Sequence, residues 1–128
     1  MYKWVISLML FVGCADYTQP NAVIRDIDVQ EAANLLKQDA TVVVLDIRTP
    51  QEFQQGHIAG AENIDFRGPE FREKIELLGP DKPYLVHCAS DGRSTRSLSV
   101  FEELQFKQMY HLEAGINGWI AAGQPVKQ

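Results

Sequence analysis

The sequence predicts an α/β protein built on a parallel sheet with helices on both faces. Residues 41–47, TVVVLDI, form a continuous β-branched and apolar run, which is typical of a parallel strand covered on both sides. Along the chain, segments with strand character alternate with segments whose apolar residues recur at helical spacing. This alternation predicts right-handed crossovers between parallel strands. In such a sheet, the loops at the carboxyl ends of the strands carry the functional site.

The first half of the chain predicts two strand–helix pairs. A short strand-like piece begins at Ile24. Asp28 followed by Glu31 predicts a helix start close to a capping box, and the alanines and leucines that follow give this helix one apolar face. After the apolar run, Thr49 is expected to cap a second helix, with Pro50 in the first helical position.

The second half of the chain predicts three more helices and two more strands. The expected elements are a helix at 66–78, a strand at 84–86, a helix at 94–105, a strand at 109–112 and a helix at 115–122. Gly68-Pro69 interrupts the first of these helices near its start, and Gly79-Pro80 is expected to end it.

Composition and charge describe an ordinary globular chain. With 128 residues, 45% hydrophobic and 23% charged, it has the length of one domain. The net charge is −5 and no basic run stands out, so nothing predicts a nucleic-acid partner. The two cysteines form neither a Cys-x-x-Cys pair nor a Cys/His cluster, so no metal site is predicted.

The N-terminal residues have the pattern of an export signal. Lys3 precedes an apolar run that is too short to span a bilayer, and the run ends in Gly-Cys. This ending resembles a bacterial lipobox, which implies lipidation at Cys14. We therefore expect a signal peptide at 1–13, a tether at 14–23 and the domain at 24–128, in an exported periplasmic or cell-envelope lipoprotein held to a membrane by its lipid. An ordinary secretory signal or an N-terminal core helix is the alternative.

The candidate site lies between the strand at 84–86 and the helix behind it. Cys88 stands where the strand stops, and a loop with backbone N–H groups turned inward, followed by a helix N-terminus, favours its thiolate form. Arg93 can hold an anion with two parallel hydrogen bonds. The predicted nucleophile is Cys88, and the predicted substrate-binding residues are Ala89, Ser90, Asp91, Gly92, Arg93 and Ser94. The alternative is that Cys88 is a small buried hydrophobic residue.

Three separate stretches resemble the rhodanese family. Residues 44–64, VLDIRTPQEFQQGHIAGAENI, resemble the N-terminal signature of rhodanese domains. The loop HCASDGRS has four residues between Cys88 and Arg93, as rhodanese loops do, and is one residue shorter than the cysteine phosphatase signature. Asp91 stands where these loops usually have Gly, and Asp tolerates positive φ better than most residues. The segment at 115–122 resembles the end of rhodanese domains.

The resemblance implies one rhodanese-like domain with a five-stranded parallel sheet. It also implies a sulfurtransferase in which Cys88 carries sulfur as a persulfide, from a small anionic donor such as thiosulfate to a thiol or cyanide acceptor. No metal or organic cofactor is needed, and a protein thiol is a further partner for an exported reactive cysteine. A non-catalytic binding or redox-sensing module stays open because of Asp91. A cysteine phosphatase or arsenate reductase is the other alternative.

Four more polar residues near these motifs are expected to be structural. Asp46 and Arg48 are predicted to pair at the end of a strand. His57 is expected to hold a turn by hydrogen bonding. His87 precedes the nucleophile in the strand and is predicted to point away from it, because neighbouring residues in a strand face opposite sides.

Overall fold

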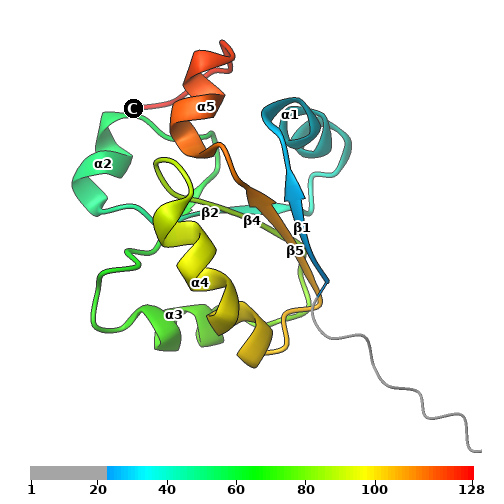
Figure 1. Ribbon diagram of the computed structural model, residues 1–128, viewed down its shortest axis with the longest axis vertical. Helices are drawn as coiled ribbons and strands as arrows, with labels where there is room; N and C mark the ends of the chain where they lie inside the picture. Colours follow the sequence, from blue (N-terminus) through cyan, green and yellow to red (C-terminus); the bar gives the residue numbers. More distant parts are fainter. Residues whose placement is uncertain (1–22) are drawn as a thin grey trace, which may run out of the picture.

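The structure, a computed structural model, describes residues 23–128 as a five-stranded parallel sheet with helices on both faces (Figure 1). The strands are β1 (Val23–Ile27), β2 (Val43–Asp46), β3 (Glu62–Asn63), β4 (Tyr84–His87) and β5 (Gln108–Leu112), in the spatial order β1-β5-β4-β2-β3. The predicted fold class is confirmed. The expected signal peptide, the lipidation site Cys14 and nearly all of the tether lie outside the described residues.

Five helices cover the sheet. They are α1 (Val29–Gln38), α2 (Pro50–Gln55), α3 (Phe71–Leu78), α4 (Gly92–Glu103) and α5 (Gly115–Ala121). The predicted caps are present: Asp28 accepts from the Glu31 backbone N–H, and Thr49 and Glu52 form a capping box around α2. None of the helices in the described part of the chain is long and apolar enough to cross a bilayer.

The two faces of the sheet bury two separate apolar clusters. On one face, which we call the α3/α4 face, Tyr84 and Val86 of β4 and Cys88 directly after it pack with α3 and α4. On the other, which we call the α1/α5 face, Leu85 packs with α1 and α5. Figure 1 shows α1 and α5 on one side of the strands and α3 and α4 on the other. Strand alternation therefore decides which residues of each strand reach the nucleophile.

Two predicted helix boundaries were wrong. The helix expected at 66–78 begins only at Phe71, because the preceding residues form a turn: the Gly68 N–H donates to the Asp65 carbonyl, and the Asp65 side chain accepts from the Arg67 N–H. The helix expected at 94–105 spans Gly92–Glu103, so it begins closer to Cys88 than predicted.

The fifth strand is the element that the sequence did not locate. β3 contains only the polar residues Glu62 and Asn63, so it shows neither a β-branched run nor an alternating pattern. It pairs with the carboxyl end of β2, and the Asn63 side chain donates to the carbonyls of Asp46 and Arg48. This edge strand thus holds the segment that follows β2.

Candidate active site

Cys88 lies directly after β4, beneath the loop that leads into α4. The residue is only 1% exposed and its thiol is free. Its Sγ atom is 3.4 Å from the Ser94 backbone nitrogen, which donates to it, and 3.4 Å from the Ser94 Oγ. Cys88 is therefore both a member of the apolar cluster and a hydrogen-bonded group at a helix N-terminus, where a negative charge on sulfur is stabilised.

The start of α5 holds the loop from the opposite side. The Ile116 N–H donates to the Cys88 carbonyl and the Asn117 N–H donates to the Ala89 carbonyl, both at 3.0 Å. In a trans peptide the next N–H points the opposite way, so the Ala89 and Ser90 amides face away from α5. Gly115 makes this contact possible, because a Cβ there would lie 2.3 Å from the Ala89 carbonyl oxygen.

Asp91 occupies the N-cap position of α4. Its φ is −130°, so the loop forms without the positive φ that the sequence reading considered for this residue. The carbonyl of Asp91 accepts from the Thr95 N–H, while its side chain makes no capping hydrogen bond and the residue is exposed. Gly92 also has no positive φ, and a Cβ there would meet nothing within 4 Å. The Asp-Gly order is thus compatible with the loop.

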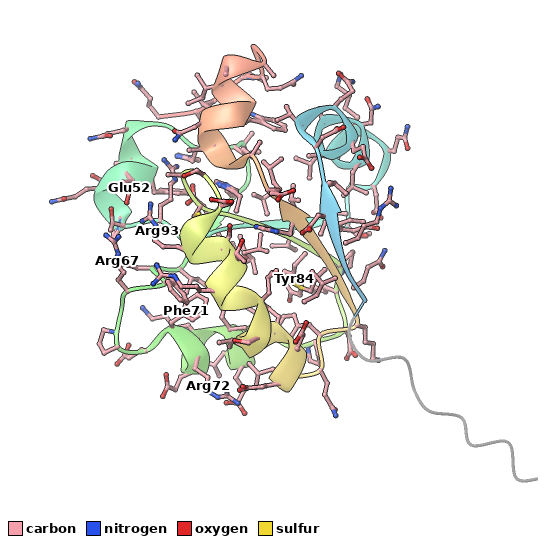
Figure 2. The ribbon with its side chains drawn as sticks, in the orientation of Figure 1. Glu52, Arg67, Phe71, Arg72, Tyr84 and Arg93 are labelled. Carbon is pink, nitrogen blue, oxygen red and sulfur yellow. The ribbon has the colours of Figure 1, made fainter. Side chains whose placement is uncertain are left out.

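Arg93 uses its two terminal nitrogens on a carboxylate of the same chain. Its NH1 and NH2 groups donate to the two Glu52 oxygens at 2.8 and 2.9 Å, and Figure 2 shows the two side chains together between α2 and α4. The hydrogen bonds from Arg93 lower the pKa of Glu52 to about 2, and the same contact raises the pKa of Arg93. The fork that was predicted to hold a substrate anion is thus engaged by Glu52.

Ser94 is the predicted site residue that contacts the sulfur with both its backbone and its side chain. Its hydroxyl also lies 2.8 Å from Nε2 of His111, and the serine is fully buried. The amide within hydrogen-bonding distance of Sγ is that of Ser94, the last of the predicted substrate-binding residues. The structure therefore brings Ser94 to the thiol, holds the loop backbone by the carbonyls of Cys88 and Ala89, and leaves Asp91 and Gly92 on the surface.

The residues expected to be structural make structural contacts. Arg48 donates to both Asp46 oxygens and to the Gly56 carbonyl, in a buried pair with an NH2–Oδ2 distance of 2.6 Å. The His57 ring stacks on Phe53, with ring centroids 3.8 Å apart. These contacts support the predicted roles in holding the fold.

His87 points toward the opposite side of the sheet from the thiol. Its Nδ1 lies 2.9 Å from the Cys88 carbonyl oxygen, while its buried Nε2 lies 3.7 Å from Asp46 and has no hydrogen-bond partner. Burial lowers the pKa of His87, although the nearby Asp46 charge opposes that shift. His87 is therefore a neutral side chain of the core.

Three residues at the site were not assigned a role there from the sequence. Glu52 was recognised within the signature but not as the partner of Arg93, because the two are 41 positions apart. His111 and Asp26 went unnoticed, although a histidine in the apolar strand QMYHL is a signal that could have pointed to them. Within residues 23–128, no three His, Cys, Asp or Glu side chains gather as metal ligands do.

Comparison with known proteins agrees with this arrangement. A family model described as rhodanese-like domain matches residues 28–122. Thiosulfate sulfurtransferase 16, chloroplastic, of Arabidopsis thaliana is 31% identical over 93 residues, which cover 65% of this chain and 78% of that protein. Thiosulfate sulfurtransferase GlpE of Pseudomonas putida is 33% identical over 98 residues, which cover 76% of this chain and 86% of that protein.

A solved structure shows the same fold. The crystal structure of a rhodanese-related protein from Thermoplasma volcanium superposes with a TM-score of 0.71 and 35% identity, covering 80% of this chain and 97% of that one. The chain spans less than two thirds of the length of several other curated relatives. Because the family model covers most of the described residues, this chain belongs to the rhodanese-like domain family.

Proposed function

We propose that this protein is a sulfurtransferase that carries one sulfur atom as a persulfide on Cys88. The observation that carries the proposal is the position of Sγ, 3.4 Å from the backbone nitrogen of Ser94 at the start of a twelve-residue helix. A thiolate or a persulfide anion at this point receives a fixed hydrogen bond and the positive end of the helix. Relatives named thiosulfate sulfurtransferase support the same chemistry.

The reaction takes place in two steps with the enzyme modified in between. The Cys88 thiolate attacks the outer sulfur of a donor such as thiosulfate, a new S–S bond forms, and sulfite leaves with the electrons of the old S–S bond. An acceptor thiolate or cyanide then attacks the outer sulfur, and the Cys88 thiolate leaves. No external oxidant or reductant is consumed, and the expected kinetics are ping-pong.

Arg93 is proposed to attract the donor while it stays bound to Glu52. A guanidinium has five N–H donors, and two of them serve Glu52, so three are free to face an anion. The pairing also restricts the arginine side chain, which reduces the entropy lost when a donor binds. Asp91 at the exposed tip of the loop repels a dianion, so the donor preference depends on the balance between these two charges.

The short loop argues for a small transferred group. A phosphoryl group presents several oxygens around a tetrahedral centre and needs a wider ring of amides. Here four residues separate Cys88 from Arg93, and the sulfur is almost fully covered. A single sulfur atom at the end of a slender donor fits this geometry better than a phosphate ester, which disfavours the phosphatase and arsenate reductase alternatives.

Intact mass spectrometry tests the proposal directly. The full chain carrying Cys14→Ser, so that only one cysteine remains, is reduced and incubated with thiosulfate. We expect a gain of one sulfur atom that is absent when Cys88→Ser is added, together with sulfite release. A gain with a low-molecular-weight persulfide but not with thiosulfate would mean that Asp91 has shifted the donor preference.

Failure to gain sulfur from either donor would overturn the sulfurtransferase proposal. Hydrolysis of an aryl phosphate by the same sample, lost in Cys88→Ser, would then favour the phosphatase. Binding to a partner without turnover would favour a non-catalytic module or a redox sensor, and a protein thiol is the first partner to try.

We also propose that the protein is exported and held at a membrane by a lipid on Cys14. The support is the sequence pattern of a short apolar run that ends in Gly-Cys. Metabolic labelling with a fatty-acid analogue should label the wild type and not Cys14→Ser. Release of Cys14→Ser into the soluble periplasmic fraction is the matching expectation, and equal labelling of both would contradict the proposal.

A further inference from the structure

A chain of hydrogen bonds runs from the nucleophile to the surface across three strands. Ser94 Oγ lies 3.4 Å from Cys88 Sγ and 2.8 Å from His111 Nε2. The other ring nitrogen of His111, Nδ1, lies 2.9 Å from an Asp26 carboxylate oxygen. His111 is 2% exposed, whereas the Asp26 side chain is 61% exposed, so the chain of contacts begins in the core and ends in solvent.

The sheet places these residues together by its register. Asp26 on β1 pairs with His111 on β5, and His111 in turn pairs with Val86 on β4, two residues before Cys88. Alternation then puts Asp26, His111 and Cys88 on the α3/α4 face, where α4 supplies Ser94. Three adjacent parallel strands, β1, β5 and β4, thus position the hydrogen-bonded residues from Asp26 to Cys88.

The hydrogen-bond partners determine which ring nitrogen of His111 carries a proton. An ionised carboxylate only accepts hydrogen bonds, so Asp26 requires the proton on Nδ1. Nε2 of the neutral ring is then a lone pair that faces the Ser94 hydroxyl. The Asp91 carbonyl oxygen is a second acceptor for that hydroxyl but lies farther away, at 3.3 Å against 2.8 Å for Nε2. The hydroxyl therefore donates to Nε2, and in the same geometry it accepts from the Cys88 thiol.

We propose that Ser94, His111 and Asp26 form a relay that takes the proton of Cys88 and holds it inside the domain while the thiolate reacts. The Cys88 S–H and Ser94 O–H bonds break, a new Ser94 O–H bond forms with the thiol proton, and a His111 Nε2–H bond forms with the hydroxyl proton. The step is a proton transfer, and no group is oxidised or reduced. The product is a thiolate and an imidazolium separated by one hydroxyl, with Asp26 beside the cation.

The buried position of the sulfur explains why such a relay is useful. An apolar environment disfavours a thiolate, and Cys88 belongs to the apolar cluster on the α3/α4 face. A cation two hydrogen bonds away offsets part of that cost, as the imidazolium does in enzymes that pair a nucleophile with histidine. Ser94 touches the reacting sulfur and is catalytic, whereas His111 and Asp26 act through it and are positioning residues.

Two further carboxylates lie near the outer end of the relay. Asp28 and Glu113 line the surface pocket that contains Asp26, but the carboxylate that His111 contacts is that of Asp26. At the inner end, Arg93 of α4 is paired with Glu52, so neither side chain is hydrogen-bonded to Ser94 or His111. His87 lies on the other face of the sheet against Asp46, so it takes no part.

The test measures the reactivity of Cys88 without any sulfur donor. In the Cys14→Ser background, the rate of alkylation by iodoacetamide is followed from pH 5 to pH 10. We expect Asp26→Asn to slow alkylation about tenfold near pH 7. At pH 10 its alkylation rate should equal that of the Cys14→Ser parent, because there the thiol ionises without the relay. Glu113→Gln is the control, because it removes the same charge from the same pocket and should leave the profile in place.

His111→Asn should shift the alkylation profile in the same direction and further. Because His111 is buried, this variant is used only if its circular dichroism spectrum matches that of the parent. If it does not, the test relies on Asp26→Asn, because the Asp26 side chain is exposed and its substitution should not disturb the fold. In the resting protein, ¹⁵N NMR should show the His111 proton on Nδ1. Profiles of Asp26→Asn and Glu113→Gln that both superimpose on the parent, or a proton on Nε2, would overturn the relay.

The relay rests on the proposed sulfur chemistry for its purpose, but its test does not depend on that chemistry. A shifted alkylation profile in a protein that never gains sulfur would keep the relay and reject the sulfurtransferase. A persulfide that forms normally in Asp26→Asn, together with an unshifted profile, would keep the sulfurtransferase and reject the relay.

Discussion

The two faces of the sheet carry the same pair of residues and use them differently. On the α3/α4 face Asp26 pairs in register with His111, and on the α1/α5 face Asp46 pairs in register with His87. Both nitrogens of His111 have partners within 2.9 Å. In contrast, Nε2 of His87 has none, although Asp46 lies 3.7 Å away.

The difference arises from what else each aspartate touches. Asp46 is fully buried and both of its carboxylate oxygens accept hydrogen bonds from Arg48, while its Oδ2 stays 3.7 Å from Nε2 of His87. Asp26 is exposed, and its Oδ1 contacts Nδ1 of His111. An Asp–His pair therefore stabilises the fold where Arg48 binds the aspartate. In the proposed relay, the other Asp–His pair activates the nucleophile, because Ser94 connects it to Cys88.

The largest expected effect on stability comes from breaking the buried pair of Asp46 and Arg48. Asp46→Ala leaves the Arg48 charge buried without its partner, and we expect it to lower the free energy of unfolding by about 3–5 kcal/mol. Asp26→Ala removes an exposed carboxylate and should cost less than about 1 kcal/mol. Urea denaturation of both variants measures the contrast, and equal losses would break the comparison between the two faces.

A smaller effect is expected where α5, from the α1/α5 face, holds the active loop. Gly115→Ala places a Cβ 2.3 Å from the Ala89 carbonyl in a backbone with φ of +63°. We expect a loss of about 2 kcal/mol in unfolding free energy, as overpacking typically costs, and loss of sulfur loading. Gly123→Ala is the matched control, since its φ is +79° but a Cβ there meets nothing within 4 Å.

The third prediction concerns pH and His87, whose Nε2 has no hydrogen-bond partner. Burial lowers the pKa of His87 in the folded protein, so below pH 6.5 the unfolded chain binds a proton that the folded chain does not. Stability should then fall as the pH drops below 6.5, by at most about 1.4 kcal/mol per pH unit. His87→Gln should remove this pH-dependent loss of stability. If the curves of unfolding free energy against pH run parallel for the wild type and His87→Gln, the prediction is wrong.

The smallest effect is expected from the ion pair beside the active loop. The pKa of Glu52 falls to about 2 because Arg93 donates to it, so its contribution is present above pH 4.5 and is lost as the pH falls toward 2. The Glu52 side chain is 32% exposed, and we expect Glu52→Gln to cost about 1 kcal/mol at neutral pH. Glu103→Gln breaks the solvent-exposed pair with Arg72 and should change stability less, which makes it the control.

Most of the fold could be predicted because the signals are local. A continuous apolar run identified β2, and caps at Asp28 and Thr49 located α1 and α2. The failures are also local in cause. β3 is too short and polar to show a period, and the turn at Asp65 delays α3 because side-chain and backbone hydrogen bonds there compete with a helix.

The site could be predicted only where it is contiguous. Cys88 and Ser94 lie in one short stretch of the chain, and the four residues between Cys88 and Arg93 match the spacing of rhodanese loops. Glu52, His111 and Asp26 reach this loop from other elements, and a sequence read alone does not supply the strand order that joins them. Alternation along β5 would have placed His111 on the side of Cys88 once the neighbouring strand was known.

The pairing of β1 with β5 also makes the reactivity of Cys88 depend on how far the chain has folded. Asp26 and His111 are 85 positions apart, and the proposed relay is complete only when the first and last strands have met. Closing so long a loop is a slow, non-local event. A chain still being synthesised therefore contains Cys88 without the proposed relay, so the activated thiol exists only in the finished domain.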